Sequence, residues 1–243
     1  TLYHLGRAYD ARAELSQALA MQLTSLRIRT AKLNPLHANV SNSLHQVGAV
    51  YQKLGNYDRA LDYYQQALEI RRKSLGENHA NVALSLFTIG NLYGSMFNYH
   101  QAIPYIKRGC AITESIYGDK SDVLPTYDAY LGSMYGHIGD HQTALEYLKK
   151  AQAMAEKNLR PDHSFLGIVY NIIGEYYADH NGSPKDATYF KKAISIFQKA
   201  HGPGPVREAD IVTRIGVTHA KNKNYALALE HLNQARRIYV HKM

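Results

Sequence analysis

The sequence predicts an all-α fold, a right-handed α-solenoid of about six helix hairpins. Three observations predict it. A glycine recurs every 42 residues through the 243-residue chain, and an aliphatic residue precedes it each time. An aromatic residue follows most of these glycines by three positions, and alanine follows most of them by twelve. A fixed period of this length is typical of one two-helix unit repeated in tandem. The glycines are Gly6, Gly48, Gly90, Gly132, Gly174 and Gly216.

Each unit is expected to contain an A helix, which holds the glycine, and a B helix, which holds the small residues. In the second unit Val40, Leu44 and Val47 have the spacing of the apolar face of a helix, and a second helical run covers 57–70. Gly55 lies between the two runs and has the chemistry of a helix stop. The unit is therefore predicted to be a hairpin of two helices.

The six units follow one another in the same register. The first four keep the glycine, the aromatic residue and the alanine, whereas the fifth has Asp186 in place of the alanine and the sixth has His219 in place of the aromatic residue. We interpret the chain as a single array that begins inside a unit and is a piece of a longer protein. The expected boundaries are 1–34, 35–76, 77–118, 119–160, 161–202 and 203–243.

A glycine within a helix needs a physical reason. Gly48 would cost about 1 kcal/mol relative to alanine in a helix interior. We expect this cost to be offset by close approach of the two helices, with Gly48 on helix A against Ala60 on helix B and Tyr51 filling the adjoining gap. The same arrangement is predicted for the other units.

The composition is that of a folded chain, with 45% hydrophobic and 20% charged residues and no run long and apolar enough to span a bilayer. The net charge is +8, and the basic excess lies at the two ends. Such an excess would attract acidic peptides or nucleic acid. The single cysteine, Cys110, occupies a position that is apolar in three other units, so we interpret it as buried filler. A lone cysteine favours a reducing compartment and a cytoplasmic location.

The pattern of aliphatic residue, Gly, two residues and Tyr, followed by Gly-x-Tyr-x-x-Ala, resembles the tetratricopeptide repeat. The 42-residue length and the turn Leu75-Gly76-Glu77-Asn78-His79 resemble the variety found in kinesin light chains. The resemblance covers the whole chain. It implies a non-catalytic scaffold or adaptor that binds an extended peptide or a partner helix on its concave face. The resemblance to kinesin light chains leaves open a preference for short acidic segments that carry an aromatic residue.

In proteins of this kind the A helices line the concave face, and the resemblance transfers that role to fixed offsets from each glycine. Amides and hydroxyls at these offsets are expected to bind a peptide main chain, Leu84 and Phe87 to offer an apolar contact, and Gly94 and Gly136 to leave room for a bulky side chain. The predicted peptide-binding residues are Asn42, His45, Gln52, Lys53, Leu84, Phe87, Asn91, Ser133, His137, Asn171, Glu175 and Lys221.

The sequence carries no nucleotide-binding, zinc-protease or serine-hydrolase motif, so we predict no catalysis and no cofactor. His37, His79 and His163 are spaced by whole units, too far apart to share a metal. Nucleic acid is disfavoured because the dibasic pairs lack interleaved aromatic residues. Two alternatives stay open. The array is a regulatory or substrate-recruiting module of a larger enzyme, or it self-associates through its open ends.

Overall fold

The computed structural model describes the chain except for residues 13, 181–184, 202–205, 222 and 241–243 and some side chains beside these gaps. Within the described residues the chain forms twelve α-helices and one short 3₁₀ helix, with no strand. This confirms the predicted all-α solenoid class. The helices group into two compact units, Thr1–Gly118 and Asp119–Met243, which we call the N-unit and the C-unit. Their border coincides with the expected boundary between the third and fourth repeats, whereas the single array stays a prediction.

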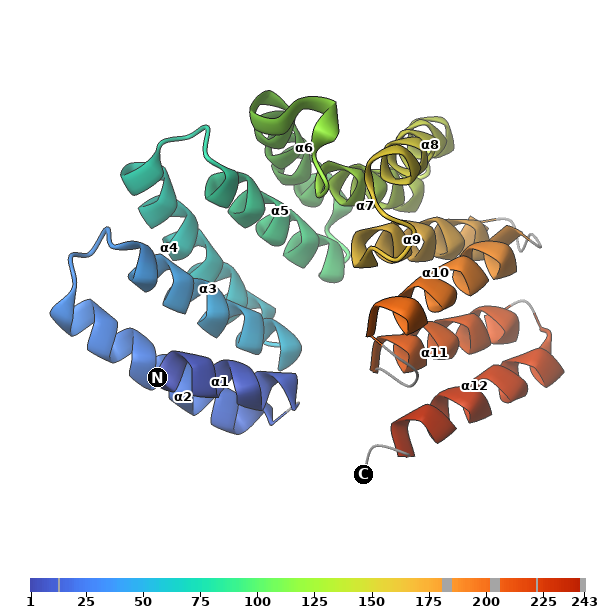
Figure 1. The fold of residues 1–243 in the computed structure, drawn as a ribbon, viewed down its shortest axis with the longest axis horizontal. Helices are drawn as coiled ribbons and strands as arrows, with labels where there is room; N and C mark the ends of the chain where they lie inside the picture. The colour runs from blue at the N-terminus through green and yellow to red at the C-terminus, as the bar shows by residue number, and fades with distance from the viewer. Residues whose placement is uncertain (13, 181–184, 202–205, 222, 241–243) are drawn as a thin grey trace. The chain divides into compact units, whose positions relative to one another are not determined.

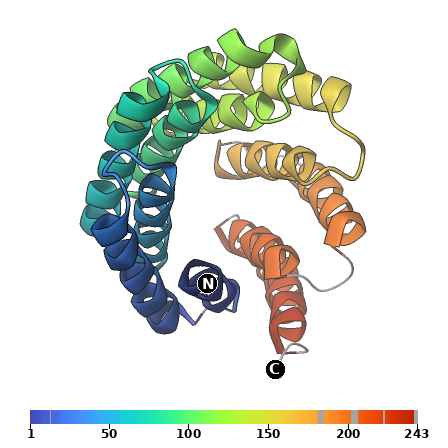
Figure 2. The ribbon, with the colours of Figure 1, turned by 60° about the vertical axis from the view of Figure 1, so that its left-hand side comes forward.

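The N-unit contains three antiparallel hairpins that stack in chain order (Figures 1 and 2). In each hairpin the odd-numbered helix is the A helix and the even-numbered one is the B helix. The helices are α1 (Leu2–Ala11), α2 (Leu15–Lys32), α3 (Ala38–Lys53), α4 (Tyr57–Leu75), α5 (Ala80–Ser95) and α6 (Tyr99–Tyr117).

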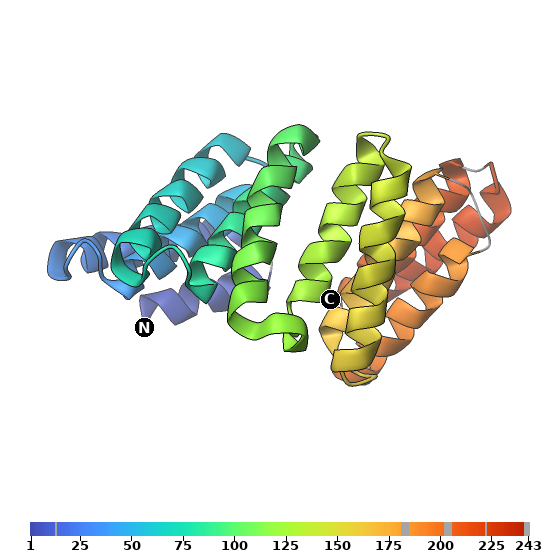
Figure 3. The same cartoon turned by 90° about the horizontal axis from the view of Figure 1, so that it is seen from above.

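The C-unit repeats this arrangement with three further hairpins (Figure 3). The short 3₁₀ helix η1 (Gly118–Lys120) precedes it at the border. The helices are α7 (Leu124–His137), α8 (His141–Asn158), α9 (Ser164–His180), α10 (Lys185–His201), α11 (Val206–Lys221) and α12 (Tyr225–Val240). None of the described helices combines the length and apolarity that crossing a bilayer requires.

The recurring glycines lie where helix A meets helix B, as predicted. A Cβ atom added to Gly48 would lie 3.2 Å from the carbonyl oxygen of Ala60 and 2.8 Å from the ring of Tyr64. A Cβ at Gly90 would lie 3.0 Å from the carbonyl oxygen of Ala102. A Cβ at Gly132 would likewise lie 3.0 Å from the carbonyl oxygen of Ala144, on the B helix of the same hairpin. The absent side chain therefore lets the two backbones approach, which offsets the low helix propensity of glycine.

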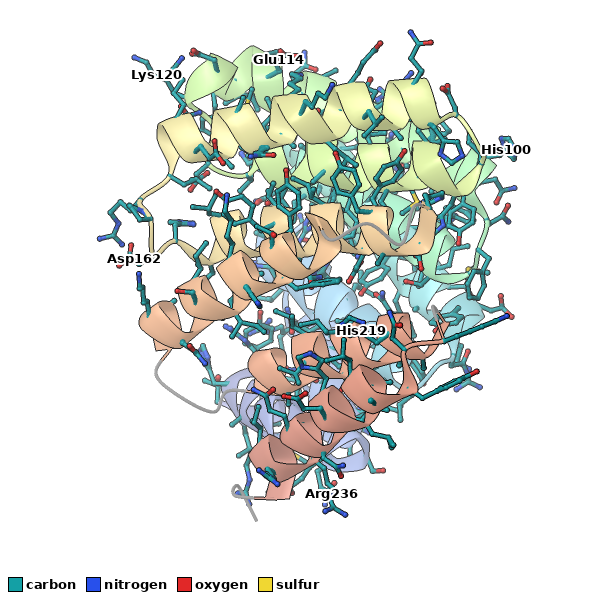
Figure 4. The ribbon with its side chains drawn as sticks, turned by 90° about the vertical axis from the view of Figure 1, so that its right-hand side faces the viewer. His100, Glu114, Lys120, Asp162, His219 and Arg236 are labelled. Atoms are coloured by element: carbon teal, nitrogen blue, oxygen red, sulfur yellow. The ribbon has the colours of Figure 1, made fainter. Side chains whose placement is uncertain are left out.

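Stacked aromatic rings brace the same hairpins. From the second hairpin to the fifth, the tyrosine three positions after the glycine stacks on a B-helix tyrosine twelve positions further on, and the ring centroids are 5.5 to 5.7 Å apart. In the sixth hairpin two histidines make the equivalent stack at 5.5 Å, and Figure 4 labels the first of them. The pairs are Tyr51–Tyr63, Tyr93–Tyr105, Tyr135–Tyr147, Tyr177–Tyr189 and His219–His231.

The three histidines at whole-repeat spacing cap A helices. The imidazole Nδ1 of His37 accepts a hydrogen bond from the backbone N–H of Asn39 at 3.0 Å, and His79 and His163 make the same contact at 3.0 and 3.2 Å. Each contact satisfies an N–H that the first turn of a helix leaves without an intrahelical partner. These histidines therefore set where the A helices begin.

The turn from helix A to helix B has one geometry in four hairpins. The second residue of the turn has a positive φ, and its N–H donates to the carbonyl oxygen of the residue three positions earlier. The N–H of the following residue donates to the carbonyl oxygen of the residue five positions before it. This pairing closes the end of the A helix. The positive-φ residues are Gly55, Phe97, Gly139 and Lys223, with φ of 75°, 59°, 86° and 63°.

Each unit has its own apolar core between the A and B helices. Val47, Leu86 and Ile89 are fully or almost fully buried in the N-unit, as are Leu131 and Phe190 in the C-unit. Cys110 is also buried, as predicted for an apolar filler. The cores hold the A helices in place and leave one side of each helix for other contacts.

Candidate functional site

The predicted peptide-binding residues lie on A helices in both units. In the N-unit all of them are at least partly exposed, and we call these seven residues the N-unit A face: Asn42, His45, Gln52 and Lys53 on α3, and Leu84, Phe87 and Asn91 on α5. In the C-unit Ser133 and His137 lie on α7, and Asn171 and Glu175 lie on α9. Lys221 is the last residue of α11, and its side chain lies outside the described residues.

Arg71, near the end of α4, ties the two helices of the N-unit A face together. Its guanidinium donates to Ser85 Oγ at 2.6 Å on α5 and to Asn42 Oδ1 at 3.1 Å on α3. It also donates to the carbonyl oxygen of Asn81 at 3.4 Å. Asn42 and α5 are thus held in register by one side chain from the intervening B helix.

The Arg71 guanidinium is a buried cation among neutral partners. The residue is only 4% exposed, its Nε lacks a hydrogen-bond partner, and no ion pair to it occurs among the described residues. Burial lowers the pKa of Arg71 below its usual range, although the group stays protonated. An unneutralised charge in a medium of low polarity acts strongly on its surroundings. The N-unit A face therefore overlies a positive centre.

Sequence reasoning missed Arg71, because a basic residue on a B helix is usually a solvated one. A signal was present in the repeat itself. Arg29 stands 42 residues earlier and donates to Ser43 Oγ at 2.9 Å and to the carbonyl oxygen of Asn39 at 3.0 Å. The recurrence of arginine with serine fourteen residues later could have revealed the link between neighbouring hairpins.

His45, a member of the same face, is held neutral. Burial, with a smaller contribution from the charge of Arg71, lowers its pKa from 6.5 to about 4. Its ring lies 5.1 Å from that of Tyr64, and its Nδ1 has no hydrogen-bond partner in the described structure. At neutral pH the imidazole is therefore uncharged, and its buried Nδ1 is an unpartnered polar atom within the predicted site.

Gln52 and Lys53 are engaged within the N-unit. Tyr64 donates its hydroxyl to Gln52 Oε1 at 2.9 Å, and Lys53 Nζ forms an ion pair with Asp10 at 2.6 Å. These contacts orient both side chains, which sequence reasoning treated as free for a ligand. The Gln52 amide still carries its NH₂ donors.

On α5 the N-unit A face is apolar. Leu84 is 41% exposed, and Phe87, one turn further along, is partly exposed. The partly exposed Asn91 follows one turn after Phe87. An exposed aliphatic residue beside an aromatic ring and an amide matches the predicted combination of an apolar contact and a hydrogen-bonding group.

The C-unit differs from the prediction at Gly136. This glycine was expected to leave room for a bulky ligand side chain, but the chain fills that room itself. A Cβ at Gly136 would lie 2.8 Å from the ring of Tyr176. The imidazole of His180 adds to the cover, because its Nε2 lies 3.2 Å from the carbonyl oxygen of Gly136. The prediction of an open pocket at Gly136 is therefore wrong.

Two predicted residues of the C-unit contact each other. Asn171 donates its Nδ2 to Glu175 Oε1 at 2.8 Å, while the buried Asn171 Oδ1 lacks a partner. This carboxylate gives α9 a negative charge, in contrast to the positive centre under the N-unit A face. The predicted residues on α9 therefore carry a negative charge, whereas the N-unit A face overlies a positive one.

Three histidines of the C-unit lie near one another. His141 and His180 approach with ring centroids 4.8 Å apart, and His137 lies 6.2 Å from His180. In the part of the chain that the structure describes, no group of three or more His, Cys, Asp or Glu side chains is placed to hold a metal ion.

A hollow of about 860 Å³ opens on the B-helix side of the N-unit, away from the predicted residues. Buried Leu68, Leu86 and Ile89 line it, with Pro104 and Tyr105 from α6. At its rim Arg72 and Arg108 share the carboxylate of Glu77, at 3.2 and 2.9 Å. None of the twelve predicted residues lines this hollow.

Comparison with known protein families identifies the repeat. The profile of the tetratricopeptide repeat matches residues 39–115 and again residues 131–158. No curated protein sequence matches the chain. The family matches fall on both sides of the border between the two units.

Solved structures show the same fold at low sequence identity. A kinesin light chain protein of Podosopora anserina with nearly identical TPR-like repeats is 19% identical, with a TM-score of 0.64 over 82% of this chain and 95% of that chain. RapI in its apo form is 18% identical, with a TM-score of 0.77 over 99% and 83% of the two chains. The Rap conjugation gene regulator of plasmid pLS20, in complex with the Phr* peptide, is 12% identical, with a TM-score of 0.67 over 99% and 73%.

Proposed function

From the premise that this chain is a tetratricopeptide-repeat protein, we propose that its N-unit A face holds an extended, acidic, aromatic-containing segment of another protein. The single observation that carries the proposal is the buried Arg71, whose charge is balanced by no carboxylate among the described residues. A carboxylate arriving from a ligand would supply the missing countercharge.

The surrounding residues supply the other contacts that such a segment needs. Asn42 binds Arg71 through Oδ1, so its NH₂ group can donate to a peptide carbonyl. Leu84 and Phe87 offer an apolar contact for a side chain of the ligand. Aromatic side chains that fill an apolar site often carry most of the energy of an interface.

The role proposed here is that of a scaffold or adaptor with no catalysis of its own. A Rap structure of the same fold holds the Phr* peptide, which supports a peptide as the class of ligand. The positive centre favours acidic over basic segments because complementary charge speeds encounter and selects partners. The lone buried Cys110 fits a reducing compartment, and we propose the cytoplasm.

A binding titration tests the proposal. We expect a fluorescent peptide with two glutamates beside a tryptophan to bind with micromolar affinity, as read by fluorescence anisotropy. The same peptide with lysines in place of the glutamates should bind at least about tenfold more weakly. Phe87→Ala should weaken binding about tenfold, because truncation of a central contact costs more than about 1 kcal/mol.

The matched control is Gln66→Ala, an exposed change on the B helix α4 that lies off the N-unit A face. It should bind like the wild type. Absence of binding at high micromolar protein, or equal affinity for the glutamate and lysine peptides, would refute the proposal.

A further inference from the structure

Phe97 occupies a backbone conformation that suits glycine. It holds the positive-φ position of the turn between α5 and α6, where the neighbouring hairpins have Gly55 and Gly139. The hydrogen bonds of the turn are the same in all three, with Phe97 N–H donating to the carbonyl of Gly94 at 3.0 Å. For a bulky residue a positive φ is an outlier that carries strain.

Burial of the Phe97 side chain within the chain does not offset this strain. Phe97 is 79% exposed, more than any other large hydrophobic residue that the structure describes. Its ring meets the edge of Tyr99 with centroids 6.4 Å apart, which orients it without burying it. Strained residues of this kind concentrate at binding sites, where a ligand makes use of the geometry.

The exposed ring borders a hollow of about 690 Å³ between the second and third A-to-B turns. Leu54, Met96 and Tyr57 give the hollow apolar walls, and Asp58 adds a carboxylate. Asp58 makes no ion pair among the described residues, and the equivalent positions of the next two repeats carry His100 and Gln142. The residues that break the repeat pattern thus meet at one place.

We infer that this hollow receives an arginine side chain of a partner protein. The aliphatic part of arginine suits the apolar walls, its planar cation suits the face of Phe97 or Tyr57, and its charge suits Asp58. The residues that line the hollow are not among those of the N-unit A face, and the hollow has the opposite preference for charge. The chain therefore contacts a basic residue of its partner at the turns and acidic residues at the A face.

A titration of the ¹⁵N-labelled chain with the tripeptide acetyl-Gly-Arg-Gly-amide tests the inference by NMR. The backbone amides of Gly55 and Phe97 should shift and saturate. The control probe has citrulline in place of arginine, which keeps the shape and removes the charge. It should bind about tenfold more weakly, because a cation over an aromatic ring and beside a carboxylate contributes on the order of tenfold in affinity.

Two variants separate strain from binding. Phe97→Gly should raise the melting temperature by about 2–4 °C, because glycine adopts a positive φ without strain. It should also lower the affinity for the arginine probe at least about threefold, because the aromatic ring is lost. Asp58→Asn should weaken the probe about tenfold and leave the melting temperature nearly unchanged. Lys223→Gly is the matched control, since Lys223 holds the same turn position in the sixth hairpin. It should raise the melting temperature in the same way and leave probe binding unchanged.

Three results would overturn the inference. The citrulline probe could shift the same amides with equal affinity, Phe97→Gly could bind arginine like the wild type, or neither probe could move the Gly55 amide. A Phe97→Gly variant with an unchanged melting temperature would remove the strain from which the inference starts.

Discussion

The N-unit and the C-unit join neighbouring hairpins with different chemistry at equivalent positions. In the N-unit Arg71 reaches Ser85 on the next A helix, and Arg29 reaches Ser43 in the same way. In the C-unit the position of Arg71 holds Phe197, and that of Ser85 holds Ile211; both belong to one apolar cluster. The preceding C-unit junction has Ala155 and Val169, which are fully buried.

This difference shows that the repeat determines which positions form the junction between hairpins, but not which residue types occupy them. An apolar junction contributes burial and close packing, whereas the arginine junction contributes directional hydrogen bonds and leaves a charge beneath a partly exposed face. If the proposed function holds, the N-unit selects the ligand and the C-unit junctions serve packing alone. Four experiments test that division.

The largest effect is expected where the junction is apolar. Phe197→Ala should lower the free energy of unfolding by about 3–5 kcal/mol, because it removes a ring that is buried in the apolar cluster shared with Ile211 of α11. Urea denaturation followed by circular dichroism measures the loss. The neighbouring exposed change Lys199→Ala should stay within about 0.5 kcal/mol of the wild type. A loss below about 1 kcal/mol in Phe197→Ala would show that this junction is not a core contact.

Acid should weaken the N-unit through His45. Its pKa is about 4 when folded and 6.5 in the reference state, so the folded chain binds fewer protons between these values. Stability from this group is complete above pH 6.5 and is lost as the pH falls toward 4, by up to about 3 kcal/mol. His45→Gln should remove that part of the pH dependence, as urea midpoints measured from pH 7 to pH 4 would show. Parallel curves for the variant and the wild type would contradict it.

A smaller effect is expected at the polar junction. Arg71→Ala should cost about 1–2 kcal/mol, because lost hydrogen bonds and a cavity outweigh the relief of a buried charge. The double change Arg71→Leu with Ser85→Val imitates the C-unit junction and should lie within about 1 kcal/mol of the wild type. Anisotropy should nevertheless show weaker binding of the glutamate peptide. Full affinity in the double variant would mean that Arg71 serves packing alone.

The smallest effect is expected on the surface. Lys53→Met breaks the ion pair with Asp10, and the Lys53 side chain is half exposed, so the loss should be below about 1 kcal/mol. Salt at 1 M should reduce the difference between the variant and the wild type. A difference that persists at high salt would point to packing of the lysine stem.

Much of the fold could be predicted from the sequence because the same pattern of glycine, aromatic and small residues recurs in six copies. The close approach at Gly48 and Ala60 followed from two residue types at constant offsets. The candidate site was harder to predict, because contacts between side chains of different hairpins depend on where each side chain points, and sequence spacing does not show this. Asn42 was identified as a polar residue of the A helix, but its partner Arg71 lies 29 residues away on a B helix. The prediction of open space at Gly136 failed for the same reason, because the ring of Tyr176 from the next A helix covers this glycine.

The turn shared by four of the hairpins has a consequence for how such chains diversify. Its backbone pairing is complete whichever residue stands at the positive-φ position, as Gly55, Phe97 and Lys223 show. One position in each of these four hairpins can therefore exchange its side chain without disturbing the architecture, at a modest cost in folding free energy. Mutation can sample new contacts there, hairpin by hairpin, and a protein engineer could randomise the same positions to select recognition of chosen targets.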